Sequence, residues 1–132
     1  MIIDTSVIIA ILQVEEDYRE LGKAIIDCVG PRKMSSSNYL EASIVVDRNA
    51  SSEVAAQLDI LITQIEIDIV PFTAVQSRIA RAAYRQYGKG SGHPAQLNFG
   101  DCFAYALAKD SGEALLFKGS DFSQTDVVAA LS

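Results

Sequence analysis

The sequence contains few of the residues that bind zinc or cross-link a chain. Its 132 residues include one histidine, two widely separated cysteines (Cys28 and Cys102) and no tryptophan. Structural zinc sites use about four cysteine or histidine ligands at short spacings, so a zinc site is not expected. Both cysteines fall in helix-like stretches, and we expect them to be buried free thiols of a cytoplasmic protein.

Long hydrophobic runs are also missing. No apolar segment approaches the roughly 20 residues that a membrane helix requires. The N-terminus has neither the basic region nor the small-residue cleavage site of a signal peptide. With 49% hydrophobic residues and only three prolines, the chain is expected to fold as one domain over residues 1–132, without a disordered tail or a membrane contact.

Positive charge is scarce as well. The chain has 11 lysines and arginines but 17 aspartates and glutamates. The resulting net charge of −6 argues against a broadly basic nucleic-acid binder. Between Asp68 and Asp101, however, there is no acid at all. This interval contains four basic residues: Arg78, Arg81, Arg85 and Lys89. Because the three arginines are spaced by three and four residues, they would share one helix face, which is either a solvated surface or a path for a polyanion.

What the sequence does contain, at its start, is a carboxylate directly after an apolar strand. Ile2 and Ile3 are β-branched and suit a sheet that is covered on both faces. Thr5 or Ser6 can cap a following helix. Asp4 would then lie at the C-terminal end of the strand, where open α/β sheets bind their ligands. A helix cap alone would also explain Asp4, so its function depends on the other acids.

The rest of the chain alternates between helical and strand-like patterns. Apolar residues spaced by three and four predict helices near residues 5–12, 17–29, 36–48, 51–65, 73–87 and from 98 onward. Short strands are predicted at 33–35, 67–70 and 114–117, with a possible edge strand at 125–128. Gly88 to Leu97, with three glycines and a proline, is predicted to be a mobile loop. The pattern indicates an α/β fold, with a short, mostly parallel sheet of four to five strands flanked by helices.

Three further acids occur at positions that match Asp4. Asp121 follows the last predicted strand, whereas Glu41 and Asp101 fall in the opening turns of helices. In a parallel sheet, the C-terminal strand ends and the following helix starts lie along one edge. Four carboxylates from four separate stretches are therefore expected to converge.

Such a cluster needs a counter-ion, because two like charges ~4 Å apart repel by about 4 kcal/mol at an intermediate dielectric. Ligands that are all oxygen select a hard cation, Mg²⁺ or Mn²⁺. An ion of this kind activates water and stabilises charge on a phosphate. The residues alone thus predict a metal-assisted phosphoryl-transfer or phosphodiesterase site. The glycine-rich loop does not match a phosphate-binding P-loop, and its His93 is expected to contact RNA rather than to catalyse.

The sequence also resembles a known family, the PIN-domain ribonucleases, and among them the VapC toxins of prokaryotic toxin–antitoxin pairs. The resemblance spans essentially the whole chain. The matching pieces are Met-Ile-Ile-Asp-Thr-Ser at 1–6, Glu41, Asn-Phe-Gly-Asp-Cys-Phe-Ala-Tyr-Ala at 98–106, Gly-Ser-Asp-Phe at 119–122 and Thr-Asp at 125–126.

The resemblance implies a Mg²⁺-dependent endoribonuclease with Asp4 and Asp101 as the principal metal ligands. Glu41 would act through water or orient the nucleophile, and Asp121 would complete the pocket. Ser6 and Ser120 look like hydroxyls that support the ligands. Asp126 also matches the family pattern, and its role, as a ligand or as a structural residue, stays open.

The resemblance also implies partners. An antitoxin would lay an amphipathic segment between the helices at 7–12, 21–29 and from 44 onward, with an arginine near the carboxylates. RNA would follow the basic residues at 78, 81, 85 and 89. A chain this small and apolar is also expected to form a homodimer.

Three other classes use related features. A receiver-like phosphoacceptor would have adjacent acids after the first strand and a lysine at a late strand end, but this chain has Asp4 alone and only Lys118 in that role. A haloacid-dehalogenase-type phosphatase would have a second aspartate where Ser6 stands. The remaining alternative is a catalytically silent RNA- or protein-binding module, which a cleavage assay with and without Mg²⁺ would distinguish.

Overall fold

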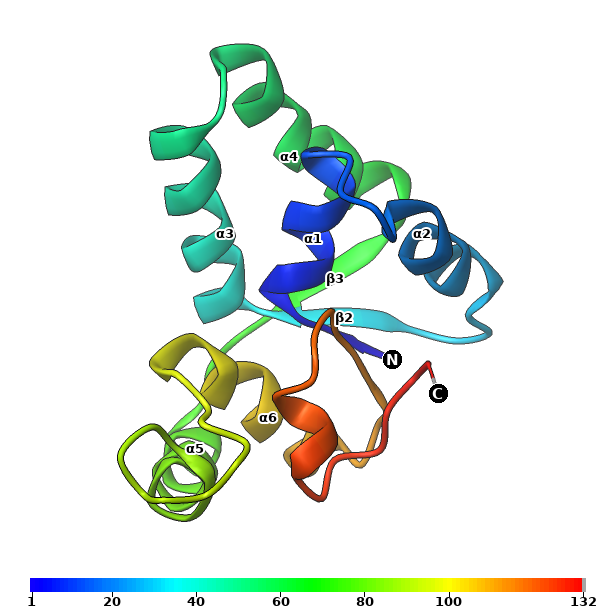
Figure 1. Cartoon of the computed structure of the whole chain (residues 1–132). Coiled ribbons are helices and arrows are strands. Elements are labelled where there is room, and N and C mark those ends of the chain that lie inside the picture. Colours follow the sequence, from blue (N-terminus) through cyan, green and yellow to red (C-terminus); the bar gives the residue numbers. More distant parts are fainter. Residues whose placement is uncertain (132) are drawn as a thin grey trace.

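The structure is a computed structural model that describes residues 1–131 (Figure 1). Four parallel strands form one sheet in the order β3-β2-β1-β4. They are β1 (Ile2–Ile3), β2 (Arg32–Ser35), β3 (Ile67–Val70) and β4 (Leu115–Leu116). The predicted α/β class and parallel sheet are confirmed.

Helices cover both faces of this sheet (Figure 1). They are α1 (Thr5–Leu12), α2 (Tyr18–Asp27), α3 (Ser36–Asn49), α4 (Ser52–Gln64), α5 (Ala74–Tyr87), α6 (Phe99–Ser111) and the short 3₁₀ helix η1 (Phe122–Gln124). The first four lie on one side, and α5 and α6 lie on the other. Among the helices of residues 1–131, none has the length and apolar character to span a bilayer.

The neighbouring strands β1 and β4 divide their side chains between these layers. Ile2 and Leu115 are paired in register and pack into the α5–α6 core, whereas their neighbours Ile3 and Leu116 pack against α1 to α4. This alternation follows from the two-residue period of a strand. All four side chains are fully buried, so both strands are fixed in register and their C-terminal ends lie together.

Helix starts are set by side-chain caps, and two of these differ from prediction. Asp4 caps α1, where Thr5 or Ser6 was expected. Ser35 caps α3, one residue before the predicted 36–38 stretch. In each case the capping residue has extended backbone, which lets its side-chain oxygen accept the N–H two residues further on. Ser51 and Asn98 cap α4 and α6, at the starts predicted for these two helices.

Two further predictions need correction. Cys102 is buried, but Cys28 lies just beyond the end of α2 and is only half-buried. The edge pairing occurs at Ala129, opposite Leu115, rather than at 125–128. The predicted loop from Gly88 to Leu97 is present, and its ends are joined because the Lys89 amide donates to the carbonyl of the fully buried Leu97 at 3.0 Å.

Candidate metal centre

Asp4 is a nearly buried carboxylate at the end of β1, with 4% of its surface exposed. Its Oδ2 accepts the Ser6 amide at 3.1 Å and the Ser6 hydroxyl at 2.6 Å. The Ser6 hydroxyl in turn accepts the Lys118 amide at 3.0 Å, which connects this acid to the exit of β4. Burial, with smaller contributions from the charges of Asp101 and Glu41, raises the pKa of Asp4 to about 7 despite these hydrogen bonds.

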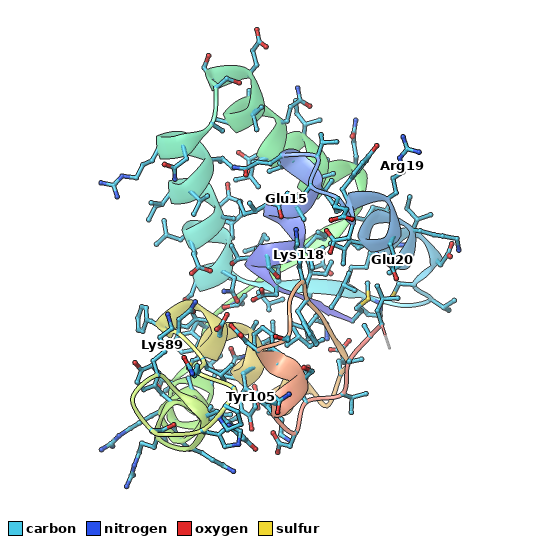
Figure 2. The ribbon with its side chains drawn as sticks, in the orientation of Figure 1. Glu15, Arg19, Glu20, Lys89, Tyr105 and Lys118 are labelled. Carbon is cyan, nitrogen blue, oxygen red and sulfur yellow. The ribbon has the colours of Figure 1, made fainter. Side chains whose placement is uncertain are left out.

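Asp101 lies in the first turn of α6 and is held by a reciprocal cap. Its amide donates to Asn98 Oδ1, and the Asn98 amide donates to Asp101 Oδ2, both at 2.9 Å. Burial raises the pKa of Asp101, and the charges of Asp121 and Glu41 add to this, whereas Lys89 opposes it. Lys89 lies near α6 in Figure 2, and its positive charge acts on Asp101 without forming an ion pair with it.

Glu41 reaches the same place from the second turn of α3. Its carboxylate lies over Gly100, where an added Cβ would come within 1.9 Å of Glu41 Oε2. The side-chain amide of the buried Asn38 donates through Nδ2 to Glu41 Oε1 at 3.3 Å and to the Gly100 carbonyl at 3.0 Å. Glu41 is half-buried, beside the fully buried stripe of α3 that contains Asn38, Ala42 and Val46.

Asp121 completes the set from the exposed start of η1, and its charge still raises the pKa of Asp101. The two predicted supporting hydroxyls differ. Ser6 binds Asp4, but the exposed Ser120 hydroxyl has no hydrogen-bond partner among residues 1–131. Asp126 stands apart, because it accepts Tyr105 at 2.6 Å and Lys109 at 3.0 Å, which hold its pKa below the usual value.

The donors that meet here are carboxylate oxygens without a protein counter-ion. No residue from 1 to 131 forms an ion pair with any of the four acids. Over the same residues, no three acid, imidazole or thiol groups are arranged to ligate one ion as they stand. Mg²⁺ is commonly held by one or two carboxylates and several waters. The donor set therefore fits an ion held partly through water, and the buried, unpartnered Asn38 Oδ1 adds one acceptor beside it.

Sequence reasoning missed the residues that arrange these acids. The sequence indicates Asn38 only as a possible helix cap and Gly100 only as part of a motif. The position of Asn38, three residues before Glu41 on the same helix face, could have predicted a hydrogen bond between their side chains. Asp17 directly precedes α2, in agreement with the helix predicted from residue 17. Glu15 and Asp17 also pair with Lys118, and Figure 2 shows Lys118 beside Glu15. The Lys118 side chain therefore points away from the acids, toward the α1–α2 turn.

An apolar groove of about 370 Å³ lies on another side of the molecule and is called here the α2 groove. Residues of three helices line it: Ile11 of α1, Tyr18, Gly22 and Ile26 of α2, and Leu61 and Ile65 at the end of α4. Ile26 is 69% exposed. A groove was predicted between these first two helices and α3, and the third wall is α4 instead.

A second apolar surface lies next to the acids and is called here the Phe99 face. It consists of Leu40 and Ile44 of α3 with Phe99 and Phe103 of α6. Phe99 is 76% exposed and separates a hollow of about 350 Å³ from one of about 310 Å³. An exposed cluster of this size marks a contact surface more often than a solvated one.

The chain is thus an α/β domain with four acids near the C-terminal edge of its parallel sheet. The PIN domain family model matches residues 1–128. "Ribonuclease VapC28" of Mycobacterium tuberculosis is 49% identical over 131 residues, which cover 99% of this chain and 98% of the relative. The chain therefore belongs to the PIN-domain family and, within it, to the VapC toxins.

Solved structures agree on the fold. The VapC20 toxin of Mycobacterium tuberculosis, described as cleaving the sarcin–ricin loop, has a TM-score of 0.78 at 15% identity and covers 96% of this chain and 95% of its own. A toxin–antitoxin complex from Klebsiella pneumoniae has a TM-score of 0.73 at 15% identity, over 97% of this chain and 94% of that one.

Proposed function

We propose that this protein is a Mg²⁺-dependent endoribonuclease that acts as the toxin of a toxin–antitoxin pair. The observation that carries the proposal is the convergence of Asp4, Glu41 and Asp101, three acids from separate elements whose charges affect one another. Asp121 stands at the rim. The names of the most similar relatives, which are ribonucleases, support the RNA substrate.

Each acid has a distinct part in this proposal. Asp4 and Asp101 would hold the ion directly, and Ser6 keeps Asp4 in place through its two hydrogen bonds. Glu41 would act through water and orient the nucleophile, and Asp121 would border the path by which a phosphate enters. When bound, Mg²⁺ would lower the pKa of water and offset the growing charge on the phosphate. Mn²⁺, with similar ligand preferences, is expected to substitute.

The direct test replaces a ligand charge without changing side-chain volume. Asp4→Asn and Asp101→Asn should each abolish RNA cleavage and keep the circular dichroism spectrum of the wild type, because only the ligand charge is lost. Asp47→Asn, an exposed acid on α3, is the control and should cleave normally. Undiminished cleavage by either site variant would refute the metal-site proposal.

The alternative is a silent RNA- or protein-binding module. It predicts no cleavage by the wild type with Mg²⁺ or Mn²⁺, and RNA or protein binding that EDTA does not alter. Cleavage that appears with Mg²⁺ and stops with EDTA would exclude it.

The basic residues are proposed to hold the RNA. Arg78, Arg81 and Arg85 are exposed on α5, which packs along α6 (Figure 1). The chain then reaches Lys89, whose positive charge acts on Asp101. A backbone lying along α5 would therefore be led toward the acids by successive positive charges, which a single metal ion could not supply over several nucleotides.

Replacing Arg81 and Arg85 together with alanine should weaken RNA binding and reduce its salt dependence. Each lost phosphate contact lowers the slope of log affinity against log salt by about 0.7 for a single strand. Binding would be measured in the cleavage-deficient Asp4→Asn background, with Arg48→Ala on α3 as the control. If the slope stays at its original value, these arginines only solvate α5.

The antitoxin is proposed to occupy the α2 groove. Its walls are almost wholly apolar, and an amphipathic helix presents apolar residues every three to four positions to such a surface. Arg19 and Lys23 also border the groove, and the exposed acids Glu16 and Glu20 lie next to Arg19, so the rim has charges of both signs. The partner is further proposed to continue beyond the groove and to place an arginine against the carboxylates of the metal centre.

Ile26→Glu should prevent co-purification with the product of the adjacent reading frame, because it puts a charge into the apolar wall of the groove. RNA cleavage by this variant should continue. Val29→Glu is the matched control, since Val29 is 99% exposed and lies outside the groove. Co-elution of the Ile26→Glu variant with the partner on gel filtration would show that the groove is not the docking site.

A homodimer is proposed to form through the Phe99 face, since a second copy could cover its exposed apolar side chains. Leu40 and Ile44 are 58% and 46% exposed. Light scattering should give the mass of a dimer for the wild type and of a monomer for Ile44→Arg. A monomeric wild type would contradict the proposal.

A further inference from the structure

We infer that Asn38 and Gly100 are positioning residues that together fix the Glu41 carboxylate beside Asp4 and Asp101. This inference rests on the proposed metal-dependent function and assigns two residues that act through Glu41 rather than on the substrate.

Asn38 supplies the hydrogen bond that Glu41 receives at this site. Its side chain is fully buried, and its Nδ2 donates to Glu41 Oε1 at 3.3 Å and to the Gly100 carbonyl at 3.0 Å. The Asn38 carbonyl accepts the Thr5 hydroxyl at 3.2 Å, which connects the same residue to α1 immediately after Asp4. One residue thus links the three helices that present Asp4, Glu41 and Asp101.

Gly100 supplies the space. A Cβ built there would be 1.9 Å from Glu41 Oε2 and 2.6 Å from Glu41 Cδ, closer than real Cβ contacts allow. Gly100 lies within α6, where alanine is favoured over glycine by about 1 kcal/mol. Helix formation therefore does not require glycine here, and the Glu41 carboxylate does.

The two roles can be separated from simple stability because the clash at Gly100 involves the far end of a flexible side chain. In Gly100→Ala, Glu41 can rotate away while α6 remains intact. The expected result is a folded protein whose Glu41 no longer faces the other acids. Gln57→Ala is the control, since Gln57 is an exposed residue of α4 and is not part of the metal centre.

The first measurement is Mn²⁺ binding by calorimetry without RNA, together with the cleavage rate and the thermal midpoint. Gly100→Ala should keep a midpoint close to the wild type and lose about 10- to 100-fold in Mn²⁺ affinity or cleavage rate, the usual effect of removing support from a ligand. Gln57→Ala should change neither the affinity nor the rate. Wild-type affinity and rate in Gly100→Ala would overturn the inference.

The second measurement asks whether Asn38 acts through Glu41. Asn38→Ala should weaken Mn²⁺ binding about tenfold on its own but by less than about twofold when Glu41 is already alanine, because coupled residues are not additive. Ser43→Ala, which removes a hydrogen bond to the Tyr39 carbonyl one turn further along α3, is the control. Equal losses in both backgrounds would overturn a role through Glu41.

These outcomes are distinct from failure of the proposed function. A wild type that neither binds Mn²⁺ nor cleaves RNA with it refutes the metal-dependent function and the inference together. A wild type that does both, with Asn38→Ala and Gly100→Ala unchanged, refutes the inference alone.

Discussion

The structure depends on a negative charge buried at the end of its central strand. Asp4 is 4% exposed, and within residues 1–131 its hydrogen-bond donors are the Ser6 hydroxyl and amide alone. Burial therefore raises its pKa to about 7. An ionised carboxylate in such a place is costly unless a cation or further donors compensate it. Instead, Glu41 and Asp101 bring more negative charge to the same place. This arrangement is unfavourable for folding alone and suits the binding of a cation.

The same strand end connects the metal centre to the α2 groove. The Lys118 amide donates to the Ser6 hydroxyl, while the Lys118 side chain pairs with Glu15 and Asp17 in the α1–α2 turn. Asp17 directly precedes α2, which forms a wall of the groove. Lys118 therefore contributes both to the support of Asp4 and to the wall of the proposed antitoxin site. Both contributions depend on the fixed pairing of β4 with β1.

Local patterns predicted what depends on neighbours in sequence. The strands at Ile2–Ile3 and Ile67–Val70, the cap at Asn98 and the acids at strand ends follow from periodicity and capping chemistry. Contacts between distant residues were not predictable in this way. Asn38 and the Gly100 carbonyl are 62 positions apart, and α4 replaces α3 in the groove because of how four helices share one sheet face. The role of Asp126 became clear only from its bonds to Tyr105 and Lys109.

The central claim is that Asp4 and Asp101 hold a divalent cation. Its most direct test is a crystal of the protein soaked in Mn²⁺ and measured at a wavelength where manganese scatters anomalously. The account predicts an anomalous peak about 2.2 Å from oxygens of Asp4 and Asp101, with Glu41 reached through water. No peak between these acids at saturating Mn²⁺, or a peak only at another acid such as Asp126, would contradict it.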